Sequence, residues 1–134
     1  MEYLVTAAEM KRCDGNTIKH FGMSSMVLME RAALACVQEL KERDRQLQEA
    51  LRPFGPVHPG RRTLVVSGTG NNGGDGLAVG RLLYQAGFSV DYCLIGNEEA
   101  KHLTEETSAQ LAILERYGPV SYTHLRAHET LANL

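Results

Sequence analysis

The order of hydrophobic patterns along the chain predicts an α/β fold, a Rossmann-like three-layer sandwich with a mostly parallel sheet. Two observations carry this prediction. A short apolar run (64–66) is followed by a glycine-rich turn (67–76) and then by a helical pattern. A second strand-like run (89–96) follows that helix, and a strand–helix–strand unit of this length requires a right-handed parallel crossover.

Two helices are expected before the first strand. Thr6 and Glu9 have the spacing of a capping box, which predicts the start of the first helix. Either Ser24 or Ser25 is expected to cap a second helix over 26–51. The apolar residues of this segment recur at helical spacing, and its second half alternates in charge. Prolines and glycines between 53 and 60 then predict a loop.

After the glycine-rich turn, a helix is expected from about Asp75 to Gln85, and Gly87 is expected to end it in a left-handed conformation. A last helix begins at Thr104 and ends near 117–119. Only two strands are visible in the pattern, and a parallel sheet is normally covered on both faces. The sequence therefore predicts the N-terminal half of such a domain, preceded by two helices.

Length and charge exclude several classes of protein. The chain has 134 residues, about one domain, and a formal net charge of -2, which predicts neither a nucleic-acid partner nor an anionic membrane surface. No apolar run approaches the roughly 20 residues that span a bilayer, and the N-terminus lacks the pattern of a signal peptide. The three cysteines are odd in number and far apart, so we expect reduced thiols and a cytoplasmic location.

The glycine-rich turn has the composition of a ligand-binding loop. Five glycines in 68–76 let the backbone approach a ligand closely, and the helix N-terminus that follows offers free N–H groups to an anion. Residues 68–73 match G-x-G-x-x-G, but the ribose-binding acid expected about 20 residues later has no good candidate, since Asp91 lies inside a strand and Glu98 beyond it. A simple dehydrogenase is therefore disfavoured. A P-loop is excluded because no Gly-Lys-Ser/Thr follows.

Three polar residues of this loop allow two interpretations. The amide oxygens of Asn71 and Asn72 are hard ligands suited to a cation, and Asp75 would face a hydroxyl, an amide or a cation rather than a phosphate. Alternatively, Asp75 caps the helix and the asparagines occupy left-handed turn positions. Spacing alone leaves both interpretations open.

Two motifs resemble one family. The string GNNGGDG at 70–76 resembles the signature of the YjeF N-terminal domain family, the NAD(P)H-hydrate epimerases, and MVLMERAA at 26–33 is similar to that family's second-helix motif. The opening, with Glu9, Met10 and Asp14, also fits. The resemblance implies a Rossmann-like domain, often a homodimer, that interconverts the S and R epimers of hydrated NADH or NADPH. It also implies a partner dehydratase, fused or separate, that restores the cofactor.

The resemblance further assigns roles to individual residues. It implies that the hydrated nucleotide contacts the loop and that Asn72 ligates a potassium ion; the loop residues concerned are Asn71, Asn72, Gly73, Gly74 and Asp75. Glu30 and Arg31 either serve as surface charge or face the site or a dimer interface, and the neighbouring Met29 is expected to pack.

The resemblance identifies no catalytic residue in this chain, because the family's catalytic aspartate is expected beyond the matching part. Candidates by residue type alone are Glu30, Asp75, His20, His58 and His102. We therefore expect the parent protein to be an epimerase and the 134-residue chain to be inactive. The alternative is a non-catalytic nucleotide-binding or assembly module of the same fold.

The C-terminal segment has a different origin in this interpretation. Residues 120–130 resemble the translation of a transposon-end adapter used to prepare sequencing libraries. The alternative is a genuine tail in which His124 and His128, at i and i+4, bind a metal. We expect the domain to comprise 1–119 and residues 120–134 to be non-native.

Overall fold

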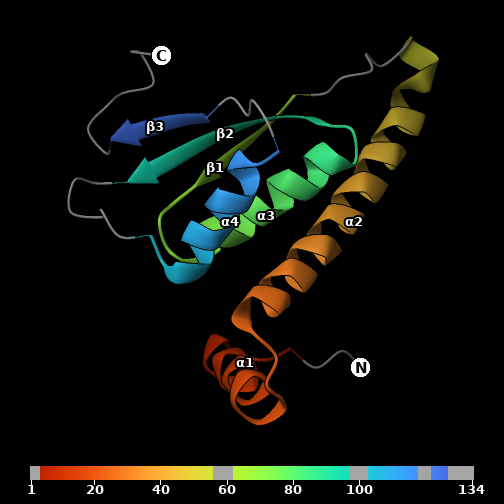
Figure 1. The fold of residues 1–134 in the computed structure, drawn as a ribbon. Coiled ribbons are helices and arrows are strands. Elements are labelled where there is room, and N and C mark those ends of the chain that lie inside the picture. The colour runs from red at the N-terminus through yellow and green to blue at the C-terminus, as the bar shows by residue number, and fades with distance from the viewer. Residues whose placement is uncertain (1–3, 56–61, 97–102, 118–121, 127–134) are drawn as a thin grey trace.

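The computed structural model describes residues 4–55, 62–96, 103–117 and 122–126. Three strands form one sheet in the order β1-β2-β3, and both pairings are parallel. Helices α3 and α4 lie along one face of this sheet (Figure 1). Helix α2 runs beside α3, and the C-terminal part of α2 extends beyond it (Figure 1). The elements are α1 (Ala7–Phe21), α2 (Ser25–Leu51), a 3₁₀ turn η1 (Arg52–Phe54), β1 (Arg62–Ser67), α3 (Asn71–Gln85), β2 (Ser89–Gly96), α4 (Glu105–Glu115) and β3 (Tyr122–Arg126). The predicted α/β class with a parallel sheet is confirmed.

The third strand was not visible in the sequence pattern. The backbone of β3 pairs with β2 from Tyr92↔Tyr122 to Gly96↔Arg126. This strand lies within 120–134, the segment that we expect to be non-native. The described sheet therefore extends by one parallel strand beyond the two that were expected.

Local capping chemistry sets the starts of the first two helices. The Thr6 hydroxyl accepts a hydrogen bond from the N–H of Glu9 at 3.3 Å, and the Glu9 carboxylate accepts one from the N–H of Thr6 at 2.8 Å. The Thr6 hydroxyl also donates to the Glu9 carboxylate at 2.8 Å, and the two hydrogen bonds that this carboxylate accepts from Thr6 lower the pKa of Glu9. Ser24 caps α2 by accepting from the N–H of Val27 at 3.4 Å. The predicted capping box is confirmed, and of the two serines Ser24 is the cap.

The hydrophobic core lies between the sheet and the helices on its covered face. Helix α3 is central to it, because it contacts α2, α4 and the strands β1 and β2. The buried members of the core come from α2, α3, β2 and α4: Val37, Leu77, Leu83, Val90, Tyr92 and Leu114. This arrangement fixes α3, and with it the glycine-rich turn at its N-terminus, against α2, α4 and two strands of the sheet.

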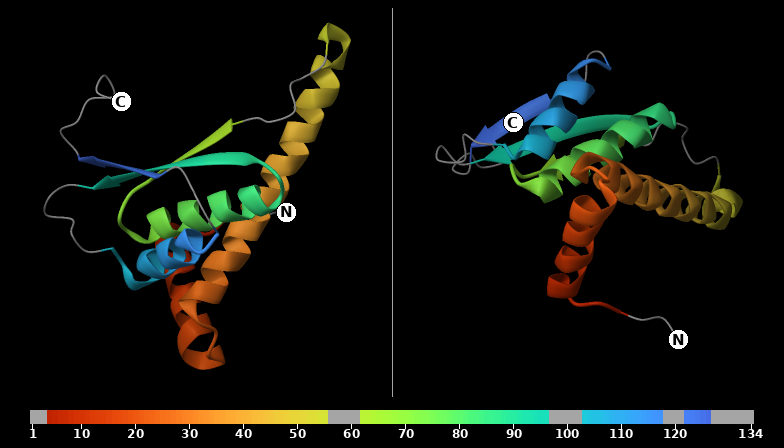
Figure 2. Two further views of the ribbon diagram at one scale, coloured as in Figure 1. Left: turned by 45° about the horizontal axis from the view of Figure 1, so that its top comes forward. Right: turned by 60° about the horizontal axis from the view of Figure 1, so that its bottom comes forward.

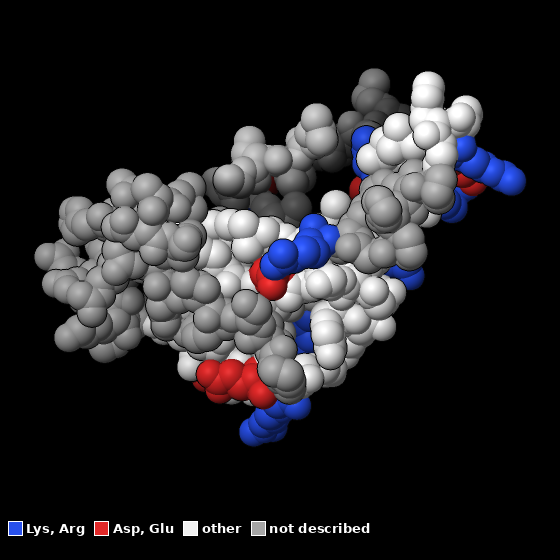
Figure 3. All heavy atoms as spheres, turned by 90° about the horizontal axis from the view of Figure 1, so that it is seen from above, with Lys and Arg blue, Asp and Glu red and all other residues white. Residues whose placement is uncertain are grey.

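The opposite face of the sheet carries no helix among the described residues (Figures 1 and 2). Side chains of β1 and β2 are exposed there, with Leu64 at 65%, Val66 at 57% and Ile95 at 41%. Seen from this side, the described surface is largely uncharged (Figure 3). Of the three predicted layers, the described residues therefore form two, the sheet and one layer of helices.

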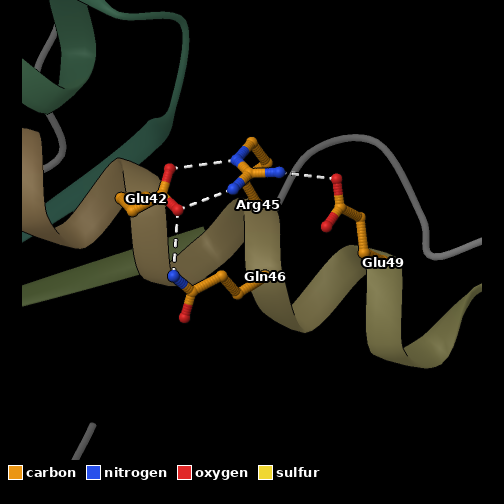
Figure 4. Close-up of polar contacts among 4 residues, drawn as sticks. All are labelled: Glu42, Arg45, Gln46 and Glu49. Carbon is orange, nitrogen blue, oxygen red and sulfur yellow. Dashed lines mark hydrogen bonds and ion pairs between the residues drawn. The ribbon is translucent and has the colours of Figure 1, made fainter.

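The C-terminal half of α2 is a solvated charged helix. Arg45 donates to Glu42 and to Glu49, in each case at 2.6 Å, and Gln46 donates to Glu42 at 2.9 Å (Figure 4). The hydrogen bond from Arg45 is the main cause that lowers the pKa of Glu42 to about 2. Exposed pairs of this kind add little to the free energy of unfolding. Within the described ranges, no helix is both long and apolar enough to cross a bilayer.

Candidate functional site

The candidate site lies at the carboxyl edge of the sheet. Because β1 and β2 are parallel, with Ser67 opposite Leu94, their C-terminal ends meet at the same edge. Residues 68–70 connect β1 to α3, and Gly70 is the N-cap of that helix. In α/β sheets, ligands bind outside the carboxyl ends of the strands.

Helix α3 begins earlier than the sequence predicted. Its first residue is Asn71 rather than a residue near Asp75, so the first turn contains the Asn-Asn-Gly-Gly segment. The interpretation of Asp75 as the helix cap is therefore wrong, because Gly70 occupies that position. The left-handed turn interpretation of the asparagines is also wrong, since no described residue other than glycine has a positive φ.

The first turn of α3 presents two free backbone donors. The carbonyl oxygen of Gly70 accepts from the N–H groups of Gly73 at 2.8 Å and Gly74 at 3.3 Å. In the described part of the chain, no hydrogen bond uses the N–H of Asn71 or Asn72, and both residues are exposed. Two unpaired donors at the positive end of a helix dipole suit a phosphate.

Residues at the start of α4 donate hydrogen bonds to the two carbonyl groups that directly precede this turn. The N–H of Thr104 donates to the carbonyl oxygen of Thr69 at 3.2 Å, and the Thr107 hydroxyl donates to that of Gly70 at 2.8 Å. Thr104 in turn donates from its hydroxyl to that of Thr107 at 2.8 Å. These bonds engage the carbonyl oxygens that would repel an anion. Sequence reasoning missed Thr107. A signal was available: Thr107 follows the expected helix start Thr104 by three residues, and that helix follows the second strand, whose C-terminal end lies at the same edge of the sheet as the turn.

Two glycines of the turn are required by close packing. A Cβ on Gly73 would stand 1.9 Å from the carbonyl oxygen of Gly68. A Cβ on Gly74 would stand 2.9 Å from both the Met29 methyl carbon and the Thr107 hydroxyl oxygen. The turn therefore packs closely against α2, α4 and its own preceding loop. At Gly73 the neighbour is backbone and only glycine fits, whereas a methyl group at Gly74 would have to displace the Met29 and Thr107 side chains.

Asp75 is the titratable group of the turn, and its pKa is shifted by its surroundings. It is half-buried on α3, and burial raises its pKa above the ordinary value for aspartate. No described residue donates a hydrogen bond to it or pairs with it. A perturbed carboxyl group without a partner inside a candidate ligand loop is a characteristic of functional sites.

The three residues of the α2 motif that were given expected roles have different surroundings in the structure. Met29 is buried against Gly74, as expected for a packing residue. Glu30 forms an ion pair with Arg81 of α3, whose side chain is 7% exposed, whereas Arg31 is exposed. The helix motif thus supports α3 through Met29 and Glu30, and Glu30 meets α3 about two turns beyond Gly74.

The remaining catalytic candidates are histidines, and the structure describes one of them. His20 is exposed on α1, and His58, His102 and His128 lie outside the described residues. Among the residues that the structure describes, no group of three or more His, Cys, Asp or Glu side chains comes together. Such a group would suit a transition metal, whereas the Asn72 amide is a neutral oxygen ligand of the type that alkali and alkaline-earth cations accept.

Comparisons with known proteins support a relationship across most of the chain. The model of the family described as YjeF-related protein N-terminus matches residues 25–131. NAD(P)H-hydrate epimerase of Limosilactobacillus reuteri is 44% identical over 110 residues, covering 80% of this chain and 46% of that protein. The protein of the same name from Leuconostoc gelidum subsp. gasicomitatum is 39% identical over 117 residues, covering 87% of this chain and 46% of its own length.

A solved structure shares the fold. The crystal structure of the yeast protein ynu0 (YNL200c) superposes with a TM-score of 0.68 at 23% identity, covering 92% of this chain and 47% of the yeast chain. This chain spans about half the length of the curated relatives it matches. Since the family model covers most of the sequence and includes the turn described above, the chain belongs to the family of YjeF-related protein N-termini.

Proposed function

We propose that this chain is the nucleotide-binding half of an NAD(P)H-hydrate epimerase, which interconverts the S and R forms of hydrated NADH and NADPH. The observation that carries the proposal is the first turn of α3, where the N–H groups of Asn71 and Asn72 are free while Thr104 and Thr107 engage the adjacent carbonyls. The curated relatives named NAD(P)H-hydrate epimerase support the reaction type.

The substrate-binding residues in this proposal are those of the turn. The two free N–H groups bind a phosphate of the hydrated nucleotide, and the half-buried Asp75 accepts a hydrogen bond from a ligand hydroxyl. Gly73 and Gly74 contribute by keeping the backbone open to close approach. The set is Asn71, Asn72, Gly73, Gly74 and Asp75.

A potassium ion is the proposed cofactor. The side-chain amide of Asn72 is exposed at the start of α3 and supplies one hard oxygen ligand. When bound, the cation would offset the negative charge of a nucleotide phosphate. Replacement of K⁺ by Na⁺ in the buffer should weaken nucleotide binding if Asn72 serves in this way.

Catalysis is assigned to the part of the protein that this chain does not contain. Epimerisation needs a positioned acid or base. Among the described residues, Asp75 is the one titratable group of the turn; Glu30 is paired with Arg81, and His20 is exposed on α1. We infer that the 134-residue chain binds the nucleotide without epimerising it.

A nucleotide-binding or assembly module is the second candidate, favoured by this same lack of a described acid–base pair.

The proposal extends to partners, location and the chain terminus. A dehydratase, fused or separate, would consume one epimer, and the complete protein would act as a homodimer. The three cysteines support a reducing compartment, the cytoplasm, because those at positions 13 and 36 are exposed and free. Residues 120–134 remain, in this proposal, a non-native tail joined to a domain that comprises 1–119.

The test measures binding and epimerisation separately. Calorimetry with hydrated NADPH in K⁺ buffer should detect binding, and Asp75→Asn and Asn72→Leu should each weaken it about tenfold, the equivalent of about 1.4 kcal/mol. Gln38→Ala, an exposed amide on α2, is the control. Chromatographic separation of the epimers should show no interconversion by the 134-residue chain. Undetectable binding would refute the site, and turnover would refute the assignment of catalysis to the missing part.

A further inference from the structure

The first turn of α3 contains an asparagine that is followed directly by a glycine, at Asn72-Gly73. In flexible chains this dipeptide is especially prone to deamidation, because glycine has no side chain to hinder the attack of its backbone nitrogen on the asparagine side chain. Asn72 is exposed, so water and base reach its amide group. Reactivity at this position therefore depends on the backbone conformation and not on burial of the amide.

The backbone of this dipeptide is held in a conformation that does not favour the reaction. The N–H of Gly73 donates to the carbonyl oxygen of Gly70 at 2.8 Å. In a helix the backbone N–H points along the helix axis, whereas the side chain projects outward. Deamidation requires the Gly73 nitrogen to lose its proton and to turn toward Cγ of Asn72, so this hydrogen bond must break first.

Packing on both sides of the hydrogen bond opposes that rearrangement. Gly73 is buried, and a Cβ on it would stand 1.9 Å from the carbonyl oxygen of Gly68, so its backbone has no room to move toward that loop. The acceptor is also fixed, because the Thr107 hydroxyl donates to the Gly70 carbonyl oxygen at 2.8 Å. Reaction at Asn72 therefore requires local opening of the first turn of α3.

We propose that Asn72 is a site of spontaneous deamidation that the folded turn protects, so that its rate of modification measures how often the turn opens. In the open turn the nitrogen of Gly73 bonds to Cγ of Asn72, and the side-chain amide nitrogen leaves as ammonia with the proton that Gly73 gives up. Water then opens the resulting succinimide to aspartate or isoaspartate. The inference rests on the geometry of the turn and does not depend on the proposed function.

Either product of the reaction alters the turn. Isoaspartate adds a methylene group to the backbone directly before Gly73, where the contact with Gly68 leaves no room for it. Aspartate replaces the neutral amide of Asn72 by a carboxylate. Under the proposed function, that negative charge would also repel the phosphate of the nucleotide. Protection of this one amide is therefore a requirement that the sequence of the loop places on the fold.

The experiment incubates the 134-residue chain at mildly alkaline pH, folded and in guanidinium chloride, and maps the modified residues by proteolysis and mass spectrometry. Asn72 should be modified at least about tenfold more slowly in the folded chain, because only the open turn reacts. Asn16, which is exposed on α1 and followed by threonine, is the internal control and should react much more slowly than Asn72 in guanidinium chloride.

Two variants test the link between the rate and the turn. Thr107→Val removes the donor that fixes Gly70 and should raise the rate in the folded chain about fivefold. Ser108→Ala, at an exposed position of the same helix, should leave the rate unchanged.

Two results would overturn the proposal. These are equal rates at Asn72 in the folded and the denatured chain, and a folded Thr107→Val variant that reacts no faster than the parent chain. Should Thr107→Val lose its helical circular dichroism signal, the comparison of folded and denatured parent chain decides alone. Nucleotide is absent throughout, so a failure of the proposed function would leave this result unchanged and the two failures are distinguishable.

Discussion

The hydroxyl of Thr107 donates a hydrogen bond of 2.8 Å to the carbonyl oxygen of Gly70, 37 residues earlier in the chain. Thr107 is completely buried on α4, and Gly70 is the N-cap of α3. The bond joins the first turns of two helices at the carboxyl edge of the sheet. A glycine-rich segment has little preference of its own for one conformation, so this bond helps to fix the position of its backbone N–H donors.

Removing that hydroxyl should weaken both the fold and nucleotide binding. Thr107→Val keeps the shape of the side chain but leaves Gly70 without one donor, so we expect a loss of about 1 kcal/mol in the free energy of unfolding. Urea denaturation measures this loss. Thr107→Ser should restore most of it, and Ser108→Ala, at an exposed position, should change nothing. Equal stability of Thr107→Val and the parent chain would show that the bond does not hold the turn.

Gly73 should not tolerate a methyl group. A Cβ there would stand 1.9 Å from the carbonyl oxygen of Gly68, a backbone atom that moves only with the loop. Gly73→Ala should therefore destabilise the chain by about 1–3 kcal/mol and displace the turn. Gly68→Ala is the control, because a Cβ on Gly68 would meet no atom within 4 Å. Thermal denaturation of the two variants compares them, and similar melting temperatures would contradict the packing described for the turn.

The sequence predicted those features that depend on neighbours in the chain. The Thr6 capping box, the Ser24 cap and the left-handed Gly87 at the end of α3 are all local, and each was found where expected. The start of α3 was placed four residues too late. Asparagine and glycine favour turns in isolation, and here contacts from α4 and Met29 hold them in a helix.

The features that sequence reasoning missed depend on topology. Thr107 reaches Gly70 only because parallel strands bring two loops to one edge of the sheet. The pairing of Arg81 with Glu30 likewise requires α2 to pack along α3. The third strand, Tyr122–Arg126, is defined by its pairing with β2 and has no strong pattern of its own. Local chemistry thus identified the ligand loop, whereas the residues that support it required the fold.

The Glu30–Arg81 pair should be worth more than the exposed pairs of α2. Arg81 is nearly buried, so Glu30→Gln leaves a guanidinium without a carboxylate, and we expect a loss of about 2 kcal/mol because Glu30 itself is partly exposed. The pair Glu39–Arg43 has side chains that are 63% and 75% exposed, and Glu39→Gln should produce no measurable change. Chemical denaturation of both variants provides the comparison. Equal effects would mean that Arg81 is better solvated than its burial indicates.

Asp75 should make stability fall as pH rises. Burial raises its pKa in the folded chain, so the folded state binds the proton more tightly than the unfolded state does. The resulting stabilisation is fully present below the ordinary aspartate pKa, about 3.9, and is lost as pH rises through the raised pKa. Asp75→Asn should therefore raise the melting temperature at pH 7, with a gain that disappears near pH 3. If the variant instead melts lower at pH 7, the carboxylate has a favourable partner in the fold.

Two helical glycines should respond to alanine with opposite signs. A Cβ on Gly80 would stand 2.5 Å from a ring carbon of Tyr92, which is buried at 3% exposure, whereas no atom lies within 4 Å of a Cβ on Gly15. Gly80→Ala must therefore displace the Tyr92 ring and should cost about 1–3 kcal/mol. Gly15→Ala should gain about 0.5–1 kcal/mol, because alanine loses less backbone entropy in a helix.

The pair of variants separates packing from helix propensity, since both replace glycine by alanine inside a helix. Calorimetric melting should shift down for Gly80→Ala and up for Gly15→Ala. Adding Tyr92→Leu to Gly80→Ala should recover part of the loss, because the shorter side chain makes room for the methyl group and removes a buried hydroxyl that lacks a partner in the described structure. A stabilising Gly80→Ala would show that α3 does not approach β2 as closely as the structure has it.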